Sequence, residues 1–328
     1  MTLPLEEQTN SLQKDPWIVE ASSRPVIRSY DPYTDYVWLE TLWKKAVHPR
    51  WFVTAAALRL TLSNSKLVVV AEQFGKPVGV GAVDYDLFGE AGLVFFLIDP
   101  SHQGRGIATF LLQAIESRLK ALGIRVLRLG AVSTGTYLWP GIPTELEASW
   151  WFFIKNGWLA EESCADLVQE LQTFSTPPWV FERIKAAGIV LQLSTPALRS
   201  SIVAFERLNF PAWSTFFEEK LCRSERDQEV LIAQTAEGGI VGSVLLETEL
   251  SSRWSVDTDL HIGSINALGV ASEYQRQGIG LALAAKAMEL LQERGCAKCY
   301  VQWTGLDAWY GNLGTSIWAQ YRMAQKSL

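Results

Sequence analysis

Two short turns hold the residues of this sequence that are best suited to bind an anion. They read Gln103-Gly104-Arg105-Gly106-Ile107-Ala108 and Gln275-Arg276-Gln277-Gly278-Ile279-Gly280, and both follow the pattern Gln-x-x-Gly-x-Gly/Ala. Glycine has no Cβ to block a close approach, and the first N–H groups of a helix have no partner within that helix. Several such amides converging on one point can hold a phosphate or a diphosphate. We therefore expect two sites for a phosphate-bearing cofactor.

A single glycine-rich turn of this kind is weak evidence, because such turns also serve close packing between a strand and a helix. Here the surroundings repeat as well. Each turn follows an apolar strand, expected over residues 95–98 and 267–270, and each strand follows a predicted hairpin, over residues 67–81 and 229–244. Each predicted helix ends at a glycine and gives way to a β-rich run. The sequence thus predicts an ancient duplication of one domain.

The two copies differ by insertions. Gln275 minus Gln103 is 172, whereas Gly242 minus Gly79 is 163, so the second copy carries 9 more residues before its turn. The first copy has the longer loop after its turn. We expect Trp139 in that loop to face a ligand, since aromatic faces suit the C–H surfaces of sugars.

The order hairpin, strand, Gln-x-x-Gly-x-Gly/Ala turn, helix, strand and aromatic-rich helix resembles the GNAT superfamily of acetyl-CoA-dependent N-acetyltransferases, twice over. The likeness runs from Pro25 to Met323. Residues 136–143 and 151–158 look most like tandem members related to glucosaminide N-acetyltransferases, and mycothiol-synthase-like enzymes are the other group considered. The resemblance implies an α/β (α+β) fold of two tandem GNAT domains, each a mixed, centrally splayed sheet flanked by helices.

The length also favours two domains, because 328 residues exceed the size at which one core keeps growing. Consecutive prolines at Thr176-Pro177-Pro178-Trp179 stop helix or strand propagation and mark the boundary. We interpret Cys164 to Leu171 as the closing strand of the first half. The expected organisation is an N-terminal tail over residues 1–23, a GNAT domain without catalytic role over 24–175, a linker over 176–180 and a catalytic GNAT domain over 181–328.

The resemblance implies acetyl-CoA as the cofactor and CoA as a product. In each half we expect it to be held by the turn and by the end of the strand before it. The residues are Leu268, Gly269, Val270, Gln275, Arg276, Gln277, Gly278, Ile279 and Gly280 in the second half, and Ile98, Gln103, Gly104, Arg105, Gly106, Ile107 and Ala108 in the first.

Amide formation from a thioester also needs a donor for the oxyanion and an acid for the departing thiolate. The resemblance implies that backbone N–H groups of residues 268–270 supply the donor. It also implies a tyrosine acid in the helix after the fifth strand, where the second half has Tyr310 and the first has Phe153. Phenylalanine has no transferable proton, so we expect the second half to be catalytic. The first half then binds cofactor structurally, shapes the acceptor cleft or has lost binding. Tyr310 as a plain packing residue is the alternative.

The general base is less determined. His261 is our first candidate, because histidine titrates near neutral pH. The alternatives are a water chain and five carboxylates: Glu247, Glu249, Asp257, Asp259 and Asp307.

Composition narrows the choice of partner. The net charge is −6 and no basic run exceeds two residues, which argues against nucleic acid and suits a cationic amine. With three histidines, and with Cys296 and Cys299 lacking a second pair, we expect no metal site. Residues 1–23 fit neither a signal nor a transit peptide, and no apolar stretch suits a membrane helix. We expect a cytoplasmic monomer or homodimer without a membrane partner.

Three functions are compatible with these residues. The first is an N-acetyltransferase acting on a small amine, an amino sugar being one candidate. The second acts on protein or peptide amines, which would favour an open acidic groove between the halves. The third is a non-catalytic acyl-CoA sensor or scaffold.

Overall fold

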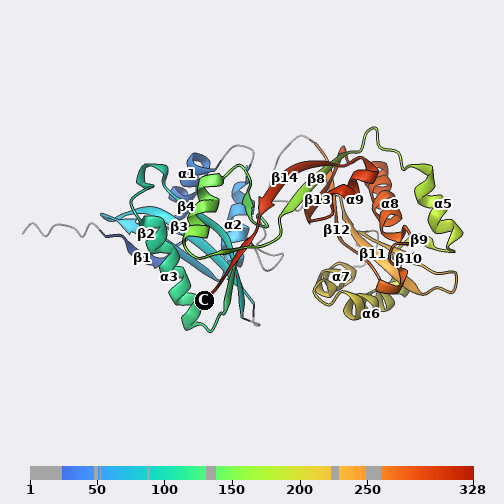
Figure 1. Ribbon diagram of the computed structural model, residues 1–328, viewed down its shortest axis with the longest axis horizontal. Helices are drawn as coiled ribbons and strands as arrows, with labels where there is room; N and C mark the ends of the chain where they lie inside the picture. The colour runs from blue at the N-terminus through green and yellow to red at the C-terminus, as the bar shows by residue number, and fades with distance from the viewer. Residues whose placement is uncertain are drawn as a thin grey trace, which may run out of the picture.

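The computed structural model describes residues 24–47, 51, 53–86, 89–130, 138–222, 229–248 and 260–328. The chain forms two mixed sheets with their helices, which lie side by side along the long axis of the molecule (Figure 1). No helix in these ranges is long and apolar enough to cross a membrane.

The first sheet is built around an antiparallel hairpin and is covered by helices on both faces. Val70 packs against α1 and α2, whereas its neighbours Val69 and Ala71 pack against α3. Both faces of the strand are therefore buried around these residues, which explains why its sequence is apolar from Leu67 to Ala71. The elements are β1 (Val26–Ser29), α1 (Tyr36–Ala46), α2 (Ala55–Asn64), β2 (Leu67–Gln73), β3 (Lys76–Tyr85), β4 (Glu90–Ile98), α3 (Ile107–Ala121), β5 (Val126–Leu129), α4 (Glu147–Lys155) and β7 (Leu159–Ala160).

The second sheet repeats this plan. Leu231 packs towards α8, whereas Val230 and Ile232 pack towards α6 and α7. A further helix, α5, precedes the first strand and packs on α8. The elements are α5 (Pro178–Ala186), β9 (Val190–Leu193), α6 (Arg199–Asn209), α7 (Ser214–Leu221), β10 (Val230–Gln234), β11 (Ile240–Glu247), β12 (Ile262–Val270), α8 (Ile279–Glu293), β13 (Lys298–Thr304) and α9 (Asp307–Tyr310).

The two halves exchange strands. β8 (Cys164–Glu170) lies between β13 and β14 (Ser316–Arg322) in the second sheet, and β14 carries the short β6 (Ile142–Pro143) on its other side. In return, β15 (Ala324–Ser327) crosses back to pair with β5 and β7 of the first sheet (Figure 1). The prediction that residues 164–171 close the first half is therefore wrong. The pattern gave the strand correctly, but a strand's partner depends on distant residues.

Candidate functional site

β12 leaves its parallel neighbour halfway along the second sheet. It pairs with β13 only from Ile262 to Ile265, so no strand of the described residues pairs with its edge from Asn266 to Val270 on that side. On the other side, a register shift opposite Ser243 and Leu245 of β11 marks a bulge. Ala267 at the bulge has a φ of 47°, which is unusual for a residue other than glycine. The second sheet is thus splayed, with backbone groups available along one edge of β12.

The second turn lies where β12 ends and α8 begins. Gly278 precedes α8 with a φ of 90°, and the first helical bond runs from the Ala282 N–H to the Gly278 carbonyl at 3.0 Å. The backbone N–H groups of residues 276–281 have no hydrogen-bond partner within the described part of the chain. The first turn is built alike: the Phe110 N–H bonds to Gly106 at 3.1 Å, and the amides of residues 104–109 have no such partner among the described residues.

The two glutamine side chains are exposed, but each donates a hydrogen bond to the strand that precedes its turn. The Gln275 side chain donates to the Val270 carbonyl at 3.1 Å, and Gln103 donates to the Ile98 carbonyl at 3.4 Å. Each turn is thereby tied to the end of the strand before it. What remains for a ligand is the row of amides, a donor set that fits the diphosphate of a coenzyme.

Tyr310 lies beside this turn. Its ring contacts that of Trp309 edge-on, with centroids 4.7 Å apart, and the Trp309 ring would lie 3.3 Å from a Cβ on Gly280. Only 5% of Tyr310 is exposed, and burial raises the pKa of the phenol well above its ordinary value. Its hydroxyl has no hydrogen-bond partner among the described residues, and it is not fully shielded from solvent. A protonated, accessible phenol suits an acid.

The matching position of the first half is closed by aromatic rings. The ring centroid of Phe153 lies 5.9 Å from that of Phe96 and 5.0 Å from that of Trp158. The Phe96 ring also stacks on that of Phe152, with centroids 6.0 Å apart. The pairing of β4 with β5 ends at Leu93, so Phe96 stands on the splayed part of β4. The rings of Phe96, Phe152 and Phe153 therefore fill the region of the first half that corresponds to the surroundings of Tyr310 in the second half.

The structure does not bring His261 to this site. It is exposed and precedes β12, six residues before Ala267, which corresponds to roughly 20 Å along an extended strand. Asp307 is exposed at the start of α9. Glu247 is better placed: it ends β11 opposite Ser264, near the bulge, and it forms an ion pair with Lys220. Glu249, Asp257 and Asp259 lie outside the described residues.

Glu206 is a functional candidate that the sequence reasoning missed. It is fully buried under α6, it accepts a hydrogen bond from the Ser243 hydroxyl, and its Oε2 has no partner among the described residues. Ser243 pairs with Gly269 of β12, and Phe210 from the end of α6 covers Gly269. Burial raises the pKa of Glu206 to about 7. Its helical phase with Ile202 and Phe205 was the signal that it faces the sheet.

A cavity of about 740 Å³ lies between the two halves. Trp303 of β13 is 46% exposed and contributes an aromatic surface. The backbone N–H of Trp303 donates to the buried carboxylate of Asp166 at 2.8 Å. Four carboxylates line the cavity, and Arg128 forms ion pairs with two of them. Because Arg128 is the one basic residue among the described residues of this lining, the net charge of the lining is negative. The lining residues are Asp86, Glu90, Arg128, Leu129, Glu161, Glu162, Ser163, Cys164, Trp303, Gly305 and Met323.

Trp139 does not face this cavity. Its ring stacks on Trp43 with centroids 5.7 Å apart and contacts Trp51 edge-on at 6.1 Å. The expectation that it faces a ligand is therefore corrected: Trp139 belongs to an aromatic cluster in which Trp51 also contacts Trp318 and Tyr321 of β14.

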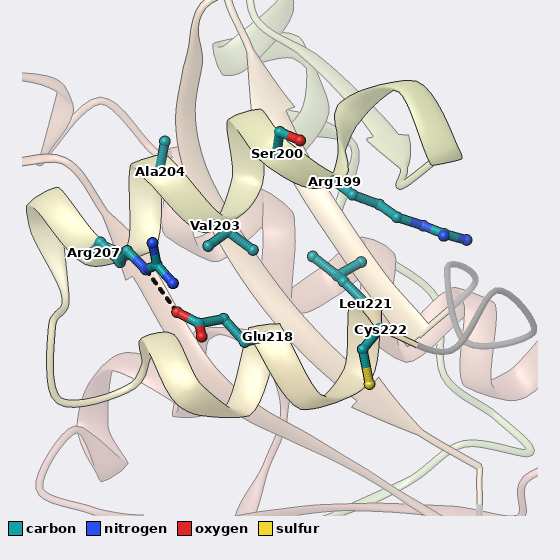
Figure 2. A pocket seen from close by; sticks show the side chains of 8 residues that line it. All are labelled: Arg199, Ser200, Val203, Ala204, Arg207, Glu218, Leu221 and Cys222. Atoms are coloured by element: carbon teal, nitrogen blue, oxygen red, sulfur yellow. Dashed lines mark hydrogen bonds and ion pairs between the residues drawn. The ribbon is translucent and has the colours of Figure 1, made fainter.

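A second hollow of about 420 Å³ lies between α6 and α7. Figure 2 shows Arg207 of α6 reaching Glu218 of α7 across it, at 2.7 Å, with Val203 pointing into the gap. Val203 and Arg207 lie on the side of α6 turned towards α7, whereas Glu206 faces the sheet. This hollow is separate from the splayed strands.

Comparison with known proteins agrees with this geometry. The model of the acetyltransferase (GNAT) family matches residues 27–137 and again residues 197–309. Since the two matches cover more than half of the sequence, the chain belongs to this family, and both the predicted tandem fold and the predicted class of enzyme, an acyltransferase, are confirmed. No curated protein sequence matches the chain significantly.

Three solved structures illustrate the likeness. A glucosamine N-acetyltransferase region of a fungal multi-domain β-N-acetylglucosaminidase is 26% identical, with a TM-score of 0.83 over 94% of this chain and 38% of that one. The chain thus spans under half the length of that relative. A GCN5-related N-acetyltransferase from Sphaerobacter thermophilus is 16% identical, with a TM-score of 0.69 over 93% and 96% of the two chains. A tandem GNAT protein from the clavulanic acid pathway is 13% identical, with a TM-score of 0.58 over 92% and 98%. The last two show the fold alone.

Proposed function

We propose that this protein is an acetyl-CoA-dependent N-acetyltransferase, that its second half is catalytic, and that its acceptor is a small-molecule primary amine. One observation carries the proposal. The second half combines turn amides without a partner among the described residues, an open edge of β12 and the buried phenol of Tyr310. In the first half, aromatic rings fill the position that corresponds to the surroundings of Tyr310.

The roles of the residues follow from their chemistry. The amides of residues 276–281 hold the coenzyme's diphosphate, and the edge of β12 from Leu268 to Val270 aligns the rest of the coenzyme. When bound, acetyl-CoA would supply the thioester, whose carbon–sulfur bond would break as the amine nitrogen bonds to the acetyl carbon. Tyr310 donates the proton that the sulfur takes up, since a phenol is protonated at neutral pH. Glu247 accepts the proton that the amine loses.

The acidic lining of the cavity between the halves suits a cationic amine of either a peptide or a small molecule, and the volume and the exposed Trp303 ring favour the small molecule. The volume of the cavity lies within the range of small-molecule sites, about 300–1,000 Å³. Four carboxylates against Arg128 favour an ammonium group, and the exposed face of Trp303 suits the C–H surface of a sugar ring. The fungal relative described as a glucosamine N-acetyltransferase points to the same class. We therefore propose an amino sugar as acceptor.

Release of free thiol from acetyl-CoA tests the proposal against a panel of glucosamine, polyamines and short peptides. Turnover with glucosamine alone is the expected result. Turnover confined to peptides would support a protein N-acetyltransferase instead, and coenzyme binding without turnover on any amine would indicate a sensor or scaffold.

A further inference from the structure

Arg183 lies directly over the second turn. It belongs to α5, which is held on α8 by Val180 and Ile184, one helical turn apart and both buried in the shared core. The Arg183 Nη2 donates to the Arg276 carbonyl at 2.7 Å. A Cβ built on Gly278 would lie 2.8 Å from the Arg183 Cδ, so the side chain runs across the glycine that precedes α8.

The charge of Arg183 is unusual at this place. The N-terminus of a helix carries a partial positive charge, so cations there are unfavourable unless an anion is also present. Arg276 adds a second guanidinium in the same turn. Within the described residues, Arg183 forms no ion pair with a carboxylate, and only one of its five N–H donors has a recorded partner. Charge and donors are therefore available beside the unpartnered amides of residues 276–281.

No described residue covers the first turn in this way. A Cβ on Gly106, the counterpart of Gly278, would meet no atom of the described residues within 4 Å. The guanidinium thus distinguishes the half that also carries Tyr310.

We propose that Arg183 is a ligand of the coenzyme's diphosphate, so that the helix between the two halves completes the coenzyme site of the second. The inference rests on the proposed function and deepens it. It also gives a second reason, besides the positive φ, for a glycine at position 278: any side chain there would displace Arg183.

Titration calorimetry of CoA with the full chain tests this proposal. Arg183→Gln removes the charge, Arg183→Lys keeps it, and Lys185→Gln removes an exposed charge from the same helix as a matched control. We expect roughly tenfold weaker binding in Arg183→Gln, because one charge-assisted hydrogen bond is lost, and near-normal binding in the other two. The dependence of the affinity on salt should become shallower only in Arg183→Gln, since screening acts on charges.

A second ligand, 3′-dephospho-CoA, keeps the diphosphate and should show the same loss. A loss seen with CoA alone would move the contact to the ribose phosphate and overturn the assignment. Equal affinities and salt dependences for Arg183→Gln and wild type would also overturn it, since Arg183 would then only brace the turn. If the wild-type chain binds no coenzyme, the proposed function itself fails, which is a different outcome.

Discussion

At the scale of single residues, turnover should depend most directly on the Tyr310 hydroxyl. Tyr310→Phe keeps the ring and its edge contact with Trp309 but removes the transferable proton. We expect turnover to fall by roughly 10²–10⁴-fold, the range typical of a lost general acid, while CoA binding is retained. Steady-state thiol release together with calorimetry measures both quantities. Undiminished turnover would exclude Tyr310 from the mechanism and leave it as a packing residue.

Glu206 gives a prediction about stability and pH. Its pKa rises from 4.5 to about 7 on folding, so the folded state binds the proton more tightly. The resulting stability is fully present below pH 4.5 and is lost as the pH rises through 7. Glu206→Gln is neutral at every pH. Wild type should therefore lose stability between about pH 5 and pH 8, whereas the variant should not. The free energy of unfolding of the variant minus that of wild type should be larger at pH 8 than at pH 5 by roughly 1–3 kcal/mol.

Urea unfolding at the two pH values measures this difference. Glu219→Gln, an exposed position on α7, is the control and should run parallel to wild type. If Glu206→Gln also runs parallel, the buried carboxyl does not titrate in this range.

At the scale of elements, the inactivity expected of the first half comes from a whole cluster and not from one missing hydroxyl. Phe153→Tyr restores a phenol there, but Phe96 and Phe152 still fill the space beside it. Introduced into the Tyr310→Phe variant, it should not restore turnover, because the rings beside the new hydroxyl occupy the space that a substrate would need. Thiol release by the double variant is the measurement. Recovery of more than about a tenth of wild-type activity would show that the first half retains a working site.

The turns were predictable from the sequence because their cause is local. Gly106 and Gly278 both take a positive φ. Glycine adopts this conformation readily, so its presence in the sequence indicates the turn. The same holds for the hairpins. Glu206 was not singled out, because its burial is decided by α6 packing on β11, and nothing in the adjacent residues states which strand that helix will cover.

At the scale of the whole molecule, chain order and sheet membership differ. β8 was predicted as a strand, yet its partners β13 and β14 lie more than a hundred residues later. Long-range pairing is set by which edges remain open after the local elements form, information that no short pattern contains. The proposed boundaries of the two domains follow the chain, whereas each sheet takes strands from both sides of the linker.

The exchange makes the first half depend on the last residues of the chain. β15 pairs with β5 and β7, and Lys326 bonds to Glu116 of α3 at 2.7 Å and to the Asn156 carbonyl at 2.9 Å. Deletion of residues 324–328 should destabilise the first half by on the order of several kcal/mol, because it removes a strand and an ion pair that is only partly exposed. Hydrogen exchange should then lose protection in β5 and α3 while α8 and β12 keep theirs. The milder Lys326→Met, which keeps the strand, should show a smaller loss in the same places. A loss confined to the second half would contradict the exchange of strands.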